Sequence, residues 1–239
     1  MNASKFVLAG LLITMASSSS AAIIYQESFE GGTLQPQTTL TGNGSSAANA
    51  FFEILPSTGL SLGYAPTGAD GTFFVGGRSL DTDFGGQSGT DALRLIDISG
   101  IDISGYTDVV LTVSLSARES NAVGLPFEED DFIRISAGDG TLGLLDEFTG
   151  PTTGSGLLSN GSVDLGAAFQ DLTYAIADGS AVNVSIGAWN NGVGESIAID
   201  NIRIEGNAVS VPEPSGIALV GLGLAALGYR RRRRTQAGC

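Results

Sequence analysis

The feature that most restricts the fold of this chain is an alternation of apolar and polar residues with a period of two. Residues 108–117, DVVLTVSLSA, place valines and leucines on one face of an extended chain and mainly Thr and Ser on the other. Residues 182–188, VNVSIGA, repeat this arrangement. Because side chains alternate across a β-strand, the pattern predicts strands with one buried face. It therefore indicates sheets that are covered on one side.

The remaining sequence between residues 23 and 206, the body of the chain, also favours strands. Runs rich in β-branched and aromatic residues, separated by Gly, Ser, Asn and Asp, predict further strands over residues 51–55, 72–76, 92–96, 132–136 and 196–205. The body shows no convincing amphipathic helix of ten residues. Two sheets packed face to face bury one side of each. We therefore expect an all-β fold, a single β-sandwich over residues 23–206.

The first 22 residues have the pattern of a secretory signal peptide. Lys5 gives a positive charge, residues 6–16 are apolar, and small residues end the segment at Ala22. The apolar stretch is too short to span a bilayer. We expect signal peptidase to cut after Ala22, so that the exported chain begins at Ile23.

The other end of the chain combines a stiff segment, a short apolar segment and a basic cluster. A linker over residues 207–214 ends in Val211, Pro212, Glu213 and Pro214, and the two prolines keep the backbone extended. Residues 215–229 follow as an apolar helix of about 22 Å, against about 30 Å of bilayer core. We expect a marginal transmembrane helix that lies only transiently in the inner membrane.

Five consecutive arginines fix the orientation expected for that helix. Positive residues stay on the cytoplasmic side, so the tail of residues 230–239 is predicted to remain inside and the body outside. The membrane-stop residues are Arg230, Arg231, Arg232, Arg233 and Arg234.

The order of a Val-Pro-Glu-Pro motif, a short apolar span and an arginine cluster resembles the PEP-CTERM sorting signal. The matching positions are Val211, Pro212, Glu213 and Pro214. The resemblance implies export from a Gram-negative bacterium, processing by an exosortase-type membrane protease, and a cell surface or secreted matrix that contains exopolysaccharide. An ordinary tail anchor is the alternative, and the shortness of the span argues against it.

Composition excludes several classes of chemistry. The chain has no histidine, and its one cysteine is Cys239 at the end, so His-based general base catalysis, His/Cys metal sites and a disulfide framework are ruled out. Residues 23–211 carry five arginines against 24 acidic residues, a net charge of −19. Such a surface repels nucleic acid and anionic membranes and suits divalent cations or neutral sugars.

Two carboxylates lie on otherwise apolar strand faces. Glu27 shares a face with Tyr25 and Phe29. Asp200 shares one with Ala198, Ile202 and Ile204. A buried carboxylate is costly unless it is paired or bound. If the terminal strands run side by side, the pair predicts a structural Ca²⁺ site of oxygen ligands. The alternative is that each carboxylate accepts hydrogen bonds from backbone N–H groups or pairs with an arginine.

The same segments carry a second resemblance. FEGG near the start and ESIAIDNIRIEG near the end are similar to the edges of MAM-type and concanavalin-like jelly-roll domains, although the disulfides typical of MAM domains are missing. The resemblance implies a jelly-roll-type β-sandwich that is adhesive or faces carbohydrate.

Two further segments attract attention. Trp189 lies opposite the apolar face of residues 182–188, which favours an exposed ring and makes it a candidate sugar-binding platform; a single aromatic residue more often packs at a sheet edge. FEEDD, residues 127–131, is an acidic run that reads as a solvated hairpin rim, with calcium binding as the alternative.

The favoured function is therefore a non-enzymatic, exported surface or matrix protein that associates with exopolysaccharide. The alternative is a lectin-like carbohydrate-binding module of defined specificity. An extracellular hydrolase is less favoured, because histidine is absent and no Glu-x-Asp-x-x-Glu pattern of a concanavalin-like glycosidase is present.

Overall fold

The computed structural model describes residues 20–47, 50–58, 62–81, 93–119, 127–153, 156–192, 194–209, 220–224 and 226. Residues 20–208 form one compact unit, and this unit holds the β-structure. Within the described part of the chain, residues 220–224 and 226 are helical, and no helix is long and apolar enough to cross a membrane.

Several sequence predictions lie outside the described residues. Residues 1–19 of the predicted signal peptide, the motif Val211 to Pro214 and the arginines 230–234 are among them. The helical residues 220–224 fall inside the apolar helix predicted over residues 215–229.

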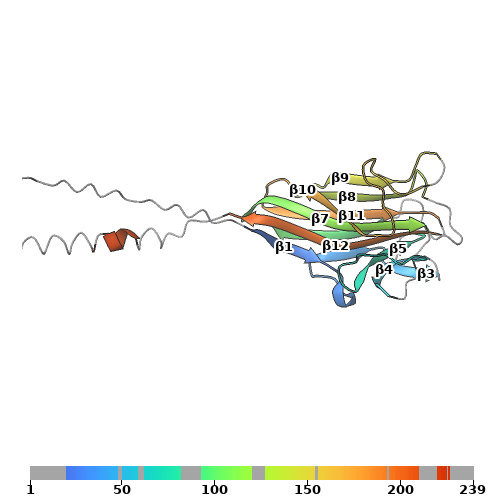
Figure 1. Ribbon diagram of the computed structural model, residues 1–239, viewed down its shortest axis with the longest axis horizontal. Coiled ribbons are helices and arrows are strands. Elements are labelled where there is room, and N and C mark those ends of the chain that lie inside the picture. Colours follow the sequence, from blue (N-terminus) through green and yellow to red (C-terminus); the bar gives the residue numbers. More distant parts are fainter. Residues whose placement is uncertain are drawn as a thin grey trace, which may run out of the picture. The chain divides into compact units, whose positions relative to one another are not determined.

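The larger of the two sheets has seven strands, all joined by antiparallel pairing (Figure 1). Its main order is β10 (Gln170–Ala175), β7 (Tyr106–Glu119), β12 (Glu195–Ala208), β5 (Phe73–Arg78), β4 (Ala50–Pro56) and β3 (Gly44–Ala47), and β1 (Ala21–Glu27) also pairs with β12. The first and last strands of the sandwich thus lie side by side, as expected for a jelly-roll-type fold.

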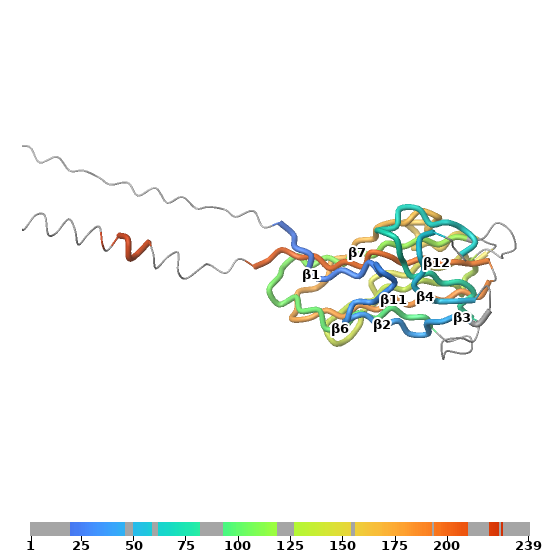
Figure 2. Tube along the Cα trace, turned by 90° about the horizontal axis from the view of Figure 1, so that it is seen from below, coloured from blue at the N-terminus to red at the C-terminus, as the bar shows by residue number. Residues whose placement is uncertain are grey.

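The second sheet has five antiparallel strands and packs over the first (Figure 2). Its order is β2 (Thr38–Thr41), β6 (Arg94–Asp102), β11 (Ala181–Trp189), β8 (Phe132–Gly138) and β9 (Gly143–Thr149). A short 3₁₀ helix, η1 (Glu30–Gly32), follows β1. The prediction of an all-β sandwich is confirmed.

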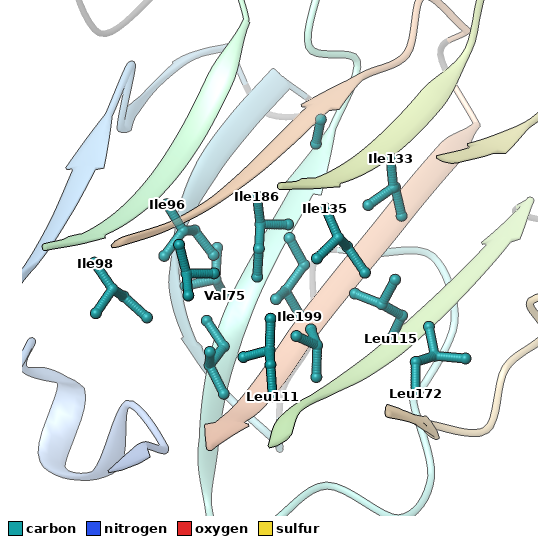
Figure 3. Close-up of a cluster of buried hydrophobic side chains, with 14 of the residues drawn as sticks. Val75, Ile96, Ile98, Leu111, Leu115, Ile133, Ile135, Leu172, Ile186 and Ile199 are labelled. Atoms are coloured by element: carbon teal, nitrogen blue, oxygen red, sulfur yellow. The ribbon is translucent and has the colours of Figure 1, made fainter. Parts of the chain in front are cut away.

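Alternating residues of the two sheets fill the space between them, as Figure 3 shows. Ile96, Ile186 and Ile135 point inward from the five-stranded sheet, and Leu111 and Ile199 point inward from the seven-stranded sheet. All five side chains are fully buried. Burial of one aliphatic side chain of this size is worth about 1.5–3 kcal/mol, so this layer is the main source of stability for the fold.

A second, smaller apolar cluster covers part of the other face of the seven-stranded sheet. Phe51, Phe74 and Ala198 pack there with Leu62 of the segment between β4 and β5. Strand β12 is therefore buried on both faces over this stretch, since Ile197 and Ile199 enter the main core while Ala198 faces the smaller cluster.

Candidate functional site

Glu27 is a buried carboxylate that holds the chain after β1. Its side chain is 1% exposed. One carboxylate oxygen accepts the backbone N–H of Phe29 at 3.0 Å, and the other accepts that of Gln35 at 2.7 Å. Phe29 has a left-handed φ of 58°, so the chain turns sharply here, and Glu27 satisfies the amides that the turn exposes.

Asp200 is also fully buried, at an irregular point of β12. Its carboxylate accepts the backbone N–H groups of Asp70 and Asn201, both at 2.7 Å. Burial is the main cause that raises the pKa of Asp200 to about 7, and the negative charges of Asp70 and Glu30 add to it. This carboxyl group therefore titrates close to neutral pH.

The expectation that Asp200 shares a face with Ile202 and Ile204 is wrong. Pairing of β12 with β7 shifts between Asp200 and Arg203, and Asn201 has a left-handed φ of 43°. Such a bulge changes the phase of the alternation. Ile202 and Ile204 enter the main core, whereas Asp200 follows the face of Ala198.

The two carboxyl groups proposed for calcium have separate surroundings. Glu27 and Asp200 share no hydrogen-bond partner among the described residues. Oε1 of Glu30 accepts the backbone N–H groups of Thr72 and Phe73, and the negative charge of Glu30, rather than that of Glu27, contributes to the raised pKa of Asp200. Over the residues that the structure covers, no group of three or more acidic side chains is placed to hold a metal ion. The Ca²⁺ site stays a prediction.

Trp189 does not have the exposed ring that the sequence suggested. It points away from the main core, as its alternation with Ile186 requires, but only 5% of its surface is exposed. A buried indole cannot serve as a stacking platform for sugar, and the burial agrees with the alternative, packing at a sheet edge. Trp189 pairs with Phe132 in the sheet, and the outer face is thus covered at this end of β11.

The remainder of the outer face of the five-stranded sheet is polar and accessible. Arg134 of β8 is paired with Glu147 of β9 at 2.5 Å, and its guanidinium lies 3.9 Å from the centre of the Phe132 ring. The arginine side chain is 46% exposed. Its neighbour across the sheet is Gly187, which has no side chain, and then Leu95.

A second row of the same face carries hydroxyl and carboxyl groups. Ser185 of β11 lies between Asp97 of β6 and Ser136 of β8, and its hydroxyl donates to Asp97 at 2.6 Å. Thr39 of β2 extends the row beyond Asp97. This face could not be predicted from the sequence, because each strand contributes one or two polar residues and the pairing that gathers them is not visible locally.

A pair of buried acids at one end of the sandwich was likewise not predicted from the sequence. Asp131, the last residue of the acidic run 127–131, and Glu195, the first of β12, are both fully buried. Phe127 is buried as well, so a fully solvated rim is wrong for this run. Glu129 and Asp130 are exposed, and only that part behaves as predicted.

Residues 210–234 match the model of the PEP-CTERM protein-sorting motif. The chain carries a PEP-CTERM sorting signal. The motif Val211 to Pro214, recognised first from its prolines and the apolar span behind it, lies inside the matched segment. A PEP-CTERM protein is targeted to exosortase and exported across the inner membrane to the cell surface of a Gram-negative bacterium.

Three solved structures are similar to this chain at low sequence identity. The K1 adhesin domain of Lys-gingipain from Porphyromonas gingivalis is 15% identical, with a TM-score of 0.47, over 79% of this chain and 99% of that one. A Stig cyclase from Fischerella is 13% identical, with a TM-score of 0.48, over 80% of this chain and 100% of that one. A xylan-binding domain of family CBM 22 is 16% identical, with a TM-score of 0.38, over 82% of this chain and 99% of that one. No curated protein matches the chain at a significant level.

Proposed function

We propose that this PEP-CTERM protein is a non-enzymatic surface protein, and that it associates with a neutral, hydroxyl-rich exopolysaccharide through the outer face of the five-stranded sheet. The observation that carries the proposal is the Arg134–Glu147 pair. It is accessible, and it is held in place by the Phe132 ring at 3.9 Å. A fixed charged pair donates and accepts hydrogen bonds without first losing side-chain entropy.

The neighbouring row supports the same reading. Further hydrogen-bond donors and acceptors lie in a row perpendicular to the strands, formed by Asp97, Ser185 and Ser136. Adjacent strands lie about 4.8 Å apart, which is close to the repeat of a sugar unit along a chain. An extended polymer can therefore make similar contacts on successive strands.

Charge favours a neutral ligand over an acidic one. Residues 23–211 have a net charge of −19, which repels anionic polymers at long range. Arg134 is one of five arginines in this region, so local attraction for a polyanion is weak.

A catalytic role is not part of the proposal. The chain lacks histidine, and the acidic pair Asp131 and Glu195 is fully buried and cannot reach a polymer. Glycosidase chemistry requires two carboxylates that face a bound sugar across an accessible cleft.

The test is binding of the exported protein, in the form delivered by the cell, to exopolysaccharide from the same cells and to an array of neutral glycans. Arg134→Ala should weaken binding about tenfold or more, as expected for loss of charged hydrogen bonds. The matched control is Arg203→Ala, which removes a similar ion pair, with Glu205 at 3.0 Å, from the other sheet. Equal effects of the two variants, or no binding by the wild type, would refute the proposed site.

A second candidate function is a lectin-like module that selects one defined glycan. The rigid geometry at Arg134 favours it, because fixed donors discriminate between sugar stereoisomers. Tight binding to one glycan on the array, rather than weak binding to several, is the result that separates this candidate from general matrix association.

We also propose that calcium stabilises the chain near Glu27 and Asp200. Both carboxylates are buried, and oxygen ligands of this kind suit Ca²⁺. A chelator should then lower the melting temperature, and Asp200→Asn should abolish that response. An identical melting curve with and without chelator would exclude the site.

A further inference from the structure

Three segments distant in sequence meet at the end of the sandwich where β12 begins. The chain just after β5 donates the Leu80 N–H to the side chain of Asn190 at 2.9 Å. The Ser79 hydroxyl donates to the carbonyl of Gly192 at 3.2 Å. The acidic run 127–131 is joined to the same turn, because the backbone N–H of Asn191 donates to Asp131 at 3.0 Å. We call this meeting point the β12 junction.

Two buried carboxyl groups, Asp131 and Glu195, come close enough inside the β12 junction to shift each other's pKa. Consecutive amides place them together: the N–H of Asn191 binds Asp131, and the N–H of Gly192 binds Glu195 at 2.6 Å. The second oxygen of Asp131 accepts the N–H of Glu128 at 2.6 Å. The second oxygen of Glu195, Oε1, is buried and has no hydrogen-bond partner. A buried acceptor without a donor is costly, so it requires an explanation.

We propose that Asp131 and Glu195 share one proton and thereby form an alkali-sensitive latch that holds the β12 junction closed. With a proton on Oε1, Glu195 donates a hydrogen bond to Asp131, and every oxygen of the pair then has a partner. Loss of that proton to water leaves two negative charges face to face in a site without solvent, and they repel each other.

A proton fits this site better than a metal ion. Three of the four carboxyl oxygens already accept a backbone N–H, whereas Ca²⁺ takes six to eight oxygen ligands. Across the described residues, no third acidic side chain joins the pair in a metal-binding arrangement. A single proton needs only the one free oxygen.

Burial and the acidic neighbours of the pair favour retention of the proton. Burial raises the pKa of Glu195 to about 8, and the charges of Asp131 and Glu128 add to the rise. Burial likewise raises the pKa of Asp131 to about 6, with Asp130 as a further negative neighbour. Asp81 and Arg94 approach from the β5–β6 side, where Arg94 donates to the carbonyl of Leu80 at 3.0 Å. The pair thus holds one proton through neutral pH and loses it in mild alkali.

The test is amide hydrogen exchange of the exported protein between pH 6 and pH 9, corrected for the intrinsic pH dependence of exchange. Protection of the Asn191, Gly192 and Glu128 amides should fall by an order of magnitude or more in the wild type, since each pKa unit corresponds to a factor of ten. Glu195→Gln, a permanent mimic of the protonated acid, should keep its protection. Glu129→Gln, an exposed change in the same run, should behave as the wild type does.

Three results would overturn the proposal. Amide protection that stays constant in the wild type, or that falls equally in Glu195→Gln, contradicts the latch. A carboxyl ¹³C titration of the wild type that gives Glu195 a pKa near 4.5 contradicts the shared proton, whether or not the variant folds. A melting temperature that drops on chelation in the wild type but not in Glu195→Gln assigns the site to a metal instead.

Discussion

Replacement of Glu27 by glutamine tests whether this carboxylate stabilises the fold through its two backbone hydrogen bonds. Glu27 is 1% exposed and accepts from Phe29 at 3.0 Å and from Gln35 at 2.7 Å. Glutamine has one carbonyl oxygen and one NH₂ group, so it can accept only one of the two amides. The other amide then faces a donor inside the protein.

The size of the effect follows from that single unsatisfied group. A buried donor that loses its acceptor costs about 1–3 kcal/mol. In a body of this size, 1 kcal/mol shifts the melting temperature by about 2–4 °C. A loss of about 2 kcal/mol should therefore lower the melting temperature of Glu27→Gln by about 4–8 °C.

Thermal unfolding followed by circular dichroism measures this shift. Glu53→Gln is the matched control, because Glu53 lies on a strand, is half-buried and should tolerate the same chemical change within about 0.5 kcal/mol. If Glu27→Gln has the same melting temperature as the control, both in calcium and in chelator, then the two hydrogen bonds contribute nothing measurable to stability and the reasoning is wrong.

Two other substitutions test the core and the buried acid of β12. Ile199→Ala should cost about 2–5 kcal/mol in urea denaturation, because Ile199 is fully buried, whereas Ile23→Ala, at a side chain 55% exposed, should cost less than about 1 kcal/mol. Equal costs would contradict the assigned core. Because the pKa of Asp200 is raised to about 7, the folded state holds a proton that the unfolded state releases near pH 4, and stability should decline as pH rises from about 4 to 7. Asp200→Asn should flatten that decline in melting temperature, and an unchanged pH profile would argue against a buried, titrating Asp200.

The strands that could be predicted from the sequence are those with a continuous apolar face. Residues 108–117, 132–136 and 196–205 all lie within observed strands. The four that were missed, β2, β3, β9 and β10, are the strands that end the two sheets. An end strand pairs on one side only and is often half-exposed, as Leu144 at 59% exposure illustrates in β9. Its side chains therefore carry little periodic signal.

The candidate sites show where local pattern is insufficient. Burial of Glu27 and Asp200 was predictable, because each lies in a run of apolar residues. The bulge at Asn201 was not, since it depends on how β12 pairs with its neighbours, and it moves Ile202 and Ile204 to the face opposite Asp200. Alternation placed Trp189 on the correct face, but it could not decide between an exposed ring and a packed one, and the ring is packed. Asp131 and Glu195 meet only because three segments fold onto one turn.

The most direct test of the central claim is the intact mass of the protein recovered from the cell surface or the culture medium. The chain is targeted to exosortase by residues 210–234. We predict that the recovered protein begins at Ile23 and lacks the residues after about Glu213. In a strain where Pro212, Glu213 and Pro214 are replaced by alanine, the tail should remain attached and delivery should fail. Recovery of a surface protein that still carries the arginines 230–234 would contradict the account.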